Sequence, residues 1–508
     1  MTDWRSMACT ALIVLCAVLG AEVTAAQSEP TRFSSPVFID METGDALAAE
    51  QGFLQVPQNR KVAGSPTIAV PYLRIKSTAA EPGTPIFWLA GGPGSSHMQR
   101  IVGPDVMSRR ASSDWSVIRR YIEDFTSVAD MVVIDQRGTG FSYPYVNCPV
   151  SAEVDPPLQE ISEAAMAPAI ADFAQRCKAA LEAGGIDVRG YHVLELADDV
   201  DALRASLGYD KISVFGGSFG SQWTFSLLRR HPEIIERVML WGIENVVDTY
   251  DKPSGTLQSL REILAEAPPL GDTGMDNADA YLQAIGELIA ELDANPEKIT
   301  VDGRTVLATG DVIRQNWRRG SGSRARMSEW YNQLAAALDG GRDAVAALAK
   351  MASGNLGYSQ QGPTGMYFSI DCGLMPPMSR VRAYRNDPAV ALLGNINLTY
   401  DSVCPVWNSP QPGDDFMAPI SSDIPALFVH GTWDTSTPLG NAEAVLSEFN
   451  NAHLIVVEGG THGVVDDLYR ENPDLIRPIL RDFLAGRPVG DLPDRVRLPA
   501  LAIAAEGQ

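Results

Sequence analysis

The stretch "KISVFGGSFGSQ" (Lys211–Gln222) constrains the fold more than any other part of the chain. An apolar run ends in two glycines, Ser218 follows, and Gly220 stands two positions later. A Gly-x-Ser-x-Gly pentapeptide is typical of a sharp strand-to-helix turn that lifts a serine hydroxyl clear of the backbone. A phosphate-binding loop would need Gly-Lys-Ser/Thr instead, which the stretch lacks. Ser218 is therefore a candidate nucleophile at the end of a strand.

Similar apolar runs occur along the chain, and each ends in glycine or a polar cluster. They are PIFWLAGG (85–92), DMVVIDQRG (130–138), RVMLWGIEN (237–245), PALFVHGTWD (425–434) and HLIVVEGGTHG (453–463). Continuous apolar strands separated by helices predict an α/β fold with a mostly parallel sheet, flanked by helices and buried on both faces. In such sheets the functional residues gather at the carboxyl ends of the strands.

The strand pattern is interrupted between about residues 246 and 420. This segment contains amphipathic helical stretches such as NADAYLQAIGELIAELDANP (277–296), and strand signals are scarce there. We predict a mostly helical cap at 246–420, inserted between a first part of the core at 27–245, which includes N-terminal strands, and a second part at 421–508.

The first residues and the composition bear on location and partners. Residues 1–26 look like a secretory signal peptide, because Arg5 precedes an apolar run and small residues lead to Ala26. The run is short for a membrane span of roughly 20 residues, although an uncleaved anchor is the alternative. The net charge of −23 argues against nucleic acid as a partner. We expect an exported protein, periplasmic or secreted, without stable membrane insertion after cleavage.

Four cysteines follow the predicted signal peptide: Cys148, Cys177, Cys372 and Cys404. An even number in an exported chain favours disulfide bonds, and pairing the neighbours in sequence is one of three possible connectivities. No two of the four are closely spaced and no histidine pair flanks them, so we expect no metal site. The oligomeric state does not follow from the sequence.

A serine nucleophile needs a base and an acid, and the sequence offers both in the expected order. His462 follows the last apolar strand, and Asp434 follows the strand before it. Asp423 is the alternative acid, but it precedes its strand and would lie at the wrong edge of the sheet. We expect His462 to take the proton from Ser218 and Asp434 to orient the imidazole.

Two backbone N–H groups are candidates for holding the oxyanion that forms in the reaction. One belongs to Phe219, directly after the nucleophile. The other lies in the loop LAGGPGSS (89–96), where Gly92 is our choice and Gly91 the alternative. Glycine at these positions lets the backbone approach a reacting carbonyl group.

In chain order, several motifs resemble the proline iminopeptidase and tripeptidyl aminopeptidase branch of the α/β-hydrolases. They are GGPG (91–94), DQRGTGFS (135–142), GGSFGSQ (216–222), GTWDTSTP (431–438) and GGTHG (459–463). The likeness covers most of the mature chain but is thin in the cap. It implies the α/β-hydrolase fold, the triad Ser218, Asp434 and His462, the two disulfides between sequence neighbours, and loop-anchoring roles for Asp135 and Arg137. In the family His or Asn often precedes GGPG, whereas this chain has Ala90.

The resemblance favours an exported serine aminopeptidase that releases N-terminal residues or short peptides through an acyl-enzyme on Ser218, without a cofactor. In the family, acidic groups near the cap hold the amino terminus of the substrate, and Glu244, just past a strand end, is the candidate here. The alternative is a carboxylesterase or related ester hydrolase with the same triad. A non-catalytic binding protein built on the fold is a third interpretation.

Overall fold

We analysed a computed structural model of the chain. It describes residues 31–39, 46–102, 115–151, 158–266, 277–301, 303–317, 322–353, 364–487 and 489–501. The predicted signal peptide, residues 1–26, lies outside the described residues. Within these ranges we find no helix with the length and hydropathy that a membrane crossing requires.

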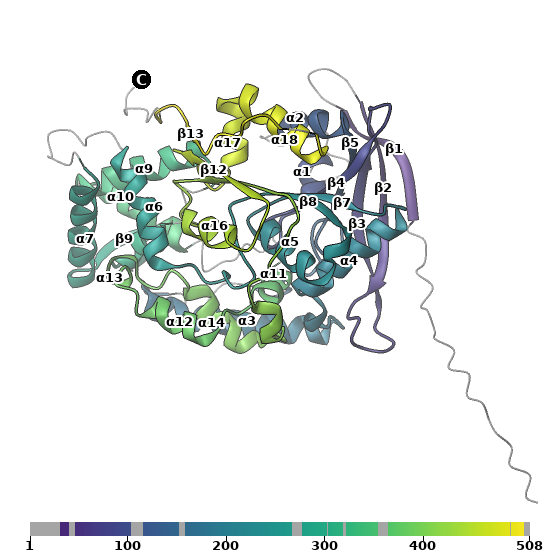
Figure 1. Cartoon of the computed structure of the whole chain (residues 1–508). Coiled ribbons are helices and arrows are strands. Elements are labelled where there is room, and N and C mark those ends of the chain that lie inside the picture. The colour runs from purple at the N-terminus through teal and green to yellow at the C-terminus, as the bar shows by residue number, and fades with distance from the viewer. Residues whose placement is uncertain are drawn as a thin grey trace, which may run out of the picture.

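A ten-stranded sheet forms the centre of the molecule, in the order β1-β2-β3-β5-β4-β7-β8-β11-β12-β13 (Figure 1). The pairs among β1, β2 and β3 and the pair β3–β5 are antiparallel, and every pair from β5 to β13 is parallel. The strands are β1 (Thr31–Ile39), β2 (Ala46–Pro57), β3 (Thr67–Ile75), β4 (Gly83–Leu89), β5 (Ala129–Ile134), β7 (Ile212–Gly217), β8 (Ile235–Trp241), β11 (Ala426–Gly431), β12 (Ala452–Glu458) and β13 (Arg495–Arg497). The predicted mostly parallel sheet is confirmed.

Helices bury both faces of this sheet, which explains why its strands read as continuous apolar runs. In β4, Ile86 and Trp88 pack into one core, and Phe87 and Leu89 pack into the other. The first core is closed by α1 (His97–Val102), α2 (Trp115–Thr126), α17 (Val464–Glu471) and α18 (Pro473–Leu484). The second is closed by α4 (Val193–Ser206), α5 (Phe219–Arg230) and α16 (Leu439–Leu446), and it continues into the helical region.

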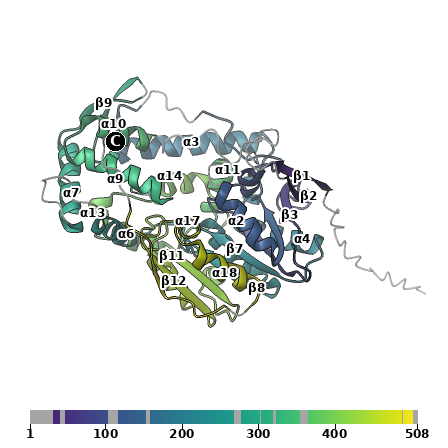
Figure 2. The same cartoon turned by 90° about the horizontal axis from the view of Figure 1, so that it is seen from above.

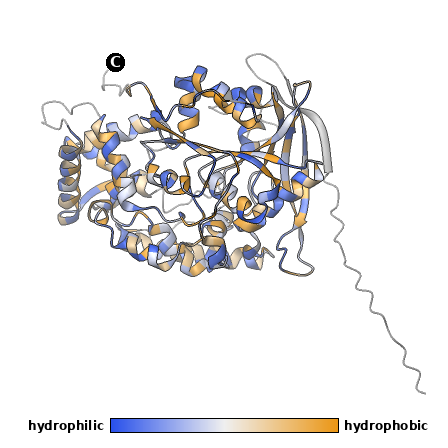
Figure 3. Cartoon of the chain, in the orientation of Figure 1, coloured by the Kyte–Doolittle hydropathy of each residue, from blue (hydrophilic) through white to orange (hydrophobic). Residues whose placement is uncertain are grey.

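The described residues between 246 and 420 are mostly helical, with one antiparallel hairpin, β9 (Glu297–Val301) and β10 (Arg304–Ala308), that we did not predict. The helices are α6 (Pro253–Ala265), α7 (Ala278–Ala294), α8 (Asp311–Arg314), α9 (Arg324–Leu338), α10 (Arg342–Ser353), α11 (Thr364–Asp371), α12 (Met378–Arg385), α13 (Val390–Leu393), α14 (Leu398–Trp407) and α15 (Asp414–Met417). Figure 3 shows apolar and polar stripes alternating on α7, as expected for a helix that buries one face.

A segment before the nucleophile also joins this helical layer. The strand β6 (Glu160–Ile161) pairs with β10, and α3 (Glu163–Ala183) runs beside α14 (Figure 2). Disulfide bonds link Cys148 to Cys177 and Cys372 to Cys404, the pairing of sequence neighbours. The first of these bonds fastens α3 to the loop that follows β5, so the layer is covalently tied to the core.

Candidate active site

Ser218 stands in a strained turn between β7 and α5. Its φ of 56° and ψ of −133° are unusual for a residue other than glycine, and such strain is typical of functional positions. The Ser218 N–H donates to the carbonyl of Trp241 at 3.0 Å. A Cβ atom on Gly217 would lie 2.0 Å from the Trp241 ring, so only glycine fits before the serine. The turn therefore fixes the backbone of Ser218 against the end of β8.

Asp434 and His462 form a hydrogen-bonded pair at the ends of β11 and β12. Nδ1 of His462 lies 2.8 Å from Oδ2 of Asp434. The buried carboxylate also accepts from the N–H groups of Ser436 and Thr437 and from the Thr437 hydroxyl at 2.6 Å. Burial acts to raise the pKa of Asp434, but His462 and these hydrogen bonds outweigh it and lower the pKa to about 2. Asp434 is therefore ionised at neutral pH and fixes one nitrogen of the imidazole.

His462 and Ser218 approach each other across Gly242. A Cβ atom on Gly242 would lie 2.9 Å from Cε1 of His462 and 3.4 Å from the backbone nitrogen of Ser218. His462 and Ser218 line the same cavity. Among the described residues no hydrogen bond joins the imidazole to the Ser218 hydroxyl, and such bonds are often long until a substrate binds. The structure thus brings Ser218, Asp434 and His462 to one rim of the sheet.

The sequence analysis missed a second buried histidine beneath the acid. Nδ1 of His430 accepts from the N–H of Ile243 at 3.3 Å, and Nε2 donates to the carbonyl of Thr437 at 2.6 Å. An N–H only donates and a carbonyl only accepts, so these partners fix a neutral imidazole with its proton on Nε2. Burial lowers the pKa of His430, which agrees with the neutral form. The spacing of four residues to Asp434 was the available signal.

The two predicted oxyanion donors lie on segments that adjoin Ser218. Phe219 is the first residue of α5, where backbone N–H groups have no partner within the helix. The loop after β4 passes over the turn so closely that a Cβ atom on Gly91 would lie 3.1 Å from Cβ of Ser218. Gly92 follows with a φ of 113°, a conformation that favours glycine. Among the described residues, the Gly92 N–H has no hydrogen-bond acceptor.

Asp135, which the resemblance assigns to loop anchoring, holds the start of α1. Its carboxyl group is 1 % exposed and accepts from the Ser96 hydroxyl at 2.5 Å and from the Met98 N–H at 3.3 Å. Burial raises the pKa of Asp135 to about 7, although these hydrogen bonds oppose the shift. Asp135 therefore links the end of β5 to the residues that follow the GGPG loop.

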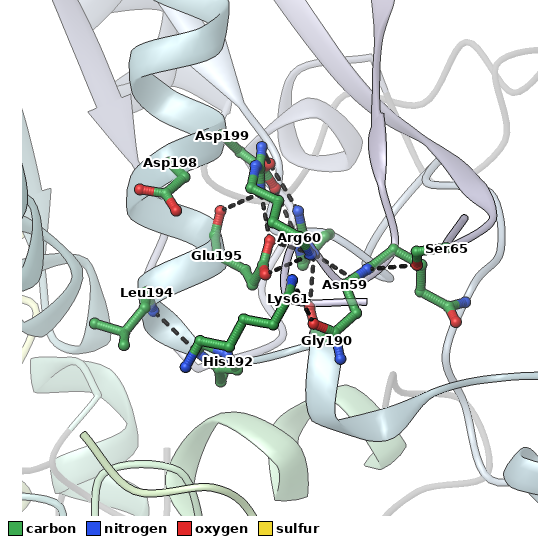
Figure 4. A network of polar contacts seen from close by, with 12 residues as sticks. Asn59, Arg60, Lys61, Ser65, Gly190, His192, Leu194, Glu195, Asp198 and Asp199 are labelled. Atoms are coloured by element: carbon green, nitrogen blue, oxygen red, sulfur yellow. Dashed lines mark hydrogen bonds and ion pairs between the residues drawn. The ribbon is translucent and has the colours of Figure 1, made fainter. Parts of the chain in front are cut away.

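Arg137 anchors the same segment on its other side. Its guanidinium group is fully buried and makes two hydrogen bonds of 2.8 Å to Asp199. Arg60 also binds Asp199 and its neighbour Glu195 on α4, and Figure 4 shows this network of charges. Breaking a buried charge pair by removing one partner typically costs about 3–5 kcal/mol, so the anchor is firm.

The cavity that contains Ser218 has a volume of about 1010 Å³ and lies between the sheet edge and the helical layer. Its walls include both glycines of the loop after β4, the aromatic rings of Trp88 and Trp241, the start of α9 and one side of α17. The charged side chains among the described lining residues are Arg100, Arg324, Arg326, Asp466, Asp467, Arg470 and Glu471. The site is therefore mixed in charge and large enough for a ligand of several residues or a drug-sized ester.

Arg324 fixes the helical layer over this cavity. It is the first residue of α9, and its guanidinium group donates to the carbonyl oxygens of Gly459, at 2.5 Å, and of Pro499. The same group lies 5.3 Å from the ring centre of Trp433. Because Gly459 and Trp433 belong to the loops that carry His462 and Asp434, the layer is fastened beside this hydrogen-bonded pair.

Glu244, the predicted ligand for the substrate's amino group, is placed differently from the triad. Its backbone N–H donates to the Ser221 hydroxyl at 2.9 Å, so this group is already used within the protein. The side chain is half-buried, and Glu244 is not among the described residues that line the cavity. The lining carboxylates come instead from α17, and of these Asp467 is occupied by the hydroxyl and N–H of Thr461. Asp466 and Glu471 are the remaining two.

A metal ion would need several His, Cys, Asp or Glu side chains close together. No group of three or more His, Cys, Asp or Glu side chains in the described ranges is arranged to hold a metal ion.

Two family models match parts of this chain. A model described as the alpha/beta hydrolase fold matches residues 84–274, and a model described as TAP-like protein matches residues 391–480. The chain belongs to the α/β-hydrolase superfamily. The first match covers β4 to the start of the helical region, including Ser218, and the second covers the segments that carry Asp434 and His462.

Among curated proteins, this α/β-hydrolase is similar to "Putative hydrolase YuaR" of Escherichia coli (strain K12), with 22 % identity over 215 residues. That match covers 41 % of this chain and 38 % of the relative, so it spans well under half of either protein. Among solved structures, MGS-M2, an alpha/beta hydrolase enzyme from a Medee basin deep-sea metagenome library, aligns at 12 % identity with a TM-score of 0.37, covering 84 % of this chain and 97 % of the other. The serine hydrolase CCSP0084 from Cycloclasticus zankles aligns at 14 % identity with a TM-score of 0.35, covering 85 % and 99 %.

Proposed function

We propose that this α/β-hydrolase is an exported serine hydrolase that acts as an aminopeptidase on short peptides. The observation that carries the proposal is the pairing of His462 with an ionised, buried Asp434 in the cavity that also holds Ser218. A buried acid that orients a histidine toward a serine is the arrangement that activates a hydroxyl group for acyl transfer.

The hydrogen bond between His462 and Asp434 determines which imidazole nitrogen takes part in the proposed reaction. Nδ1 of His462 is bonded to Asp434, so Nε2 is the nitrogen that takes the proton from Ser218 Oγ as it attacks the substrate carbonyl. The N–H groups of Phe219 and Gly92 stabilise the oxyanion. The imidazolium then protonates the leaving amine and an ester forms on Ser218. Water, activated by the same nitrogen, hydrolyses this ester and restores the serine.

Two observations support peptide substrates over simple esters. The segment with Asp434 and His462 matches the family model described as TAP-like protein, and the motifs resemble the tripeptidyl aminopeptidase branch. The helical layer, fastened by Arg324, leaves a bounded cavity that would exclude folded polypeptides. A short peptide would then enter with its amino terminus at the carboxylates of the wall.

The location of Glu244 favours the alternative, an ester hydrolase with the same triad. An aminopeptidase needs a carboxylate to receive the substrate's ammonium group, and Glu244 does not line the cavity. Asp466 and Glu471 of α17 do line it and would take that role in the aminopeptidase. Asp466 is partly engaged, since it accepts from the Tyr121 hydroxyl at 2.5 Å, whereas Glu471 is exposed.

Export is part of the proposal because it accounts for the two disulfide bonds, which persist in oxidising compartments. The signal-like sequence at 1–26 supports the same conclusion. N-terminal sequencing of the protein recovered from a periplasmic or culture fraction tests it, and an unprocessed chain that remains in the cytoplasm would contradict it.

One experiment separates the proposed activities. The purified chain is first treated with a fluorophosphonate probe, which should label the wild type at Ser218 and leave Ser218→Ala unlabelled. A panel of aminoacyl, prolyl and tripeptidyl chromogenic amides is then compared with aryl esters. Absence of labelling would overturn the serine hydrolase, while turnover of esters without any amide would leave the ester hydrolase.

A further inference from the structure

Gln136 lies between the two anchoring residues of the loop after β5, and its side chain contacts the loop that carries the predicted oxyanion donor. It is fully buried. Its Nε2 donates to the carbonyl of Ala90 at 3.0 Å and to the carbonyl of Gly91 at 2.9 Å. Its Oε1 accepts from the N–H of Gly94 at 2.8 Å. One carboxamide therefore satisfies three backbone groups within five residues of that loop.

These bonds, together with one from the Ser95 N–H to the Gly91 carbonyl at 3.4 Å, set the direction of the Gly92 N–H. The peptide bond between Gly91 and Gly92 is not among the cis bonds of the described chain, so it is trans and planar. In a trans peptide the C=O and the following N–H point to opposite sides. Because the Gly91 carbonyl points at Gln136, the Gly92 N–H points away from Gln136.

The loop also lies close to the nucleophile, because Gly91, Gly92 and Ser218 line the same cavity. A Cβ atom on Gly91 would be 3.0 Å from the Gly217 carbonyl oxygen and 3.1 Å from Cβ of Ser218. At such close approach a rotation of the peptide would exchange a donor for a carbonyl oxygen, which repels an oxyanion. Stabilisation of the oxyanion depends on donors that are already in place before the charge develops.

The backbone of Gln136 is itself held on both sides. Asp135 binds the start of α1, and Arg137 is bound by Asp199 on α4. The carboxamide thus projects from a fixed point, and its two bonds of 2.9 and 3.0 Å define one orientation of the loop. If the backbone around Gln136 were mobile, its side chain could not hold the loop in one orientation.

We propose that Gln136 is a positioning residue that orients the Gly91–Gly92 peptide so that its N–H serves the oxyanion. The inference rests on the proposed serine hydrolase function of Ser218. Gln136 does not touch the substrate and acts only through the backbone of the loop. Its replacement should therefore impair the transition state while the binding of the substrate is retained.

Two variants and a matched control test this role. Gln136→Met keeps the length of the side chain and removes all three hydrogen bonds. Gln136→Glu keeps the acceptor for Gly94 but sets carboxylate oxygen against the carbonyls of Ala90 and Gly91. Gln58→Met is the control, since Gln58 is also a buried glutamine, bonded through its carboxamide to the Tyr191 hydroxyl and the Asp187 N–H.

The readouts are chosen so that a merely structural role would leave them unchanged. With 4-nitrophenyl butyrate, Gln136→Met should lower kcat about 10²-fold, the size of effect known for the loss of one oxyanion donor, and change KM by less than about 3-fold. The affinity for phenylboronic acid, which forms a tetrahedral adduct with the serine, should fall by a similar factor. Gln58→Met should leave kcat and the boronate affinity within about 3-fold of the wild type.

The pH dependence of Gln136→Glu supplies a second readout. Burial beside Asp135 would raise the pKa of a carboxyl group at this position. When that group is protonated it donates one hydrogen bond and restores part of the contact with the loop. The ratio of variant to wild-type kcat should therefore rise as the pH falls, and a constant ratio would contradict the inference.

The result that overturns the inference is a kcat for Gln136→Met within about 3-fold of Gln58→Met, or a loss that lies wholly in KM. If neither Gln136 variant folds, a crystal structure of the wild-type phenylboronate adduct decides. A boronate oxygen about 2.7–3.1 Å from the Gly92 N–H, with Gln136 still bound to Gly91, supports the role, and a boronate that the Gly92 N–H does not contact refutes it. Failure of the wild type to react with fluorophosphonate would instead refute the proposed function.

Discussion

Asp135 should make the stability of this protein fall as the pH rises, and Asp135→Asn should remove that dependence. The carboxyl group is 1 % exposed, and burial raises its pKa from 3.8 to about 7. Neutral hydrogen bonds from Ser96 and from the backbone of His97 and Met98 oppose the shift without reversing it. The folded state therefore prefers the protonated carboxyl group over much of the physiological range.

The sign and size follow from proton linkage. Between the two pKa values the folded chain binds a proton that the unfolded chain has released, so the free energy of unfolding decreases as the pH rises toward 7. The pKa of Asp135 is 3.8 in the unfolded chain and about 7 in the folded chain. This difference lowers the free energy of unfolding by about 3 kcal/mol as the pH goes from 4.5 to 8. Asparagine resembles the protonated acid, because it accepts from Met98 and its amide can donate to the Ser96 oxygen.

The assay is urea unfolding of wild type and Asp135→Asn across this range, with the disulfide bonds intact. Other groups titrate alike in both proteins, so the difference in unfolding free energy isolates Asp135. The variant should gain about 3 kcal/mol relative to the wild type as the pH goes from 4.5 to 8. A difference that stays constant within about 0.5 kcal/mol would refute the reasoning, since it would show that burial does not hold the proton on Asp135.

Three further predictions concern the triad and the cavity wall. Ser218→Gly should abolish fluorophosphonate labelling yet raise the free energy of unfolding by about 1 kcal/mol in urea titrations, because glycine relieves the strain at φ 56°; equal or lower stability would count against strain there. Asp434→Asn should lower kcat for aryl esters by about 10⁴-fold, because asparagine cannot hold the protonated tautomer of His462 as the carboxylate does, and a loss below about 10-fold would show that another group orients the imidazole. Glu471→Gln should raise KM for aminoacyl amides and spare aryl esters, while Glu244→Gln should change neither; the reverse pattern would restore Glu244 as the ligand for the amino terminus.

The sheet was predictable because its strands are buried on both faces and read as apolar runs. The turn at Ser218 was predictable because few chain geometries need three glycines around one serine. Selecting His462 among six histidines depended on chain order, and the structure gives other partners to several of the rest. His192 caps α4, His231 pairs with Asp198, and His453 lies 3.2 Å from the Pro493 carbonyl.

What the sequence could not supply were contacts between segments far apart in the chain. Gln136 meets Ala90 and Gly91 across about 45 positions, and no local pattern marks a side chain that bonds only to backbone. The hairpin β9–β10 is short, and its pairing with β6 joins residues about 150 positions apart. Glu244 was chosen for its place after a strand, yet the direction in which a loop side chain points depends on neighbours such as Ser221, which no periodicity reports.

Two of the side chains that brace the proposed active site, His430 and Gln136, are neutral. His430 joins the loop of the acid, through Thr437, to Ile243, which directly follows the glycine that separates His462 from Ser218. Gln136 does the equivalent for the oxyanion loop. A brace that carried a charge near neutral pH would change the spacing of the catalytic groups whenever it titrated, and it would compete with the charge that develops on the imidazole. Because burial keeps His430 neutral and a carboxamide does not ionise, these two braces keep the same charge while other groups of the region titrate.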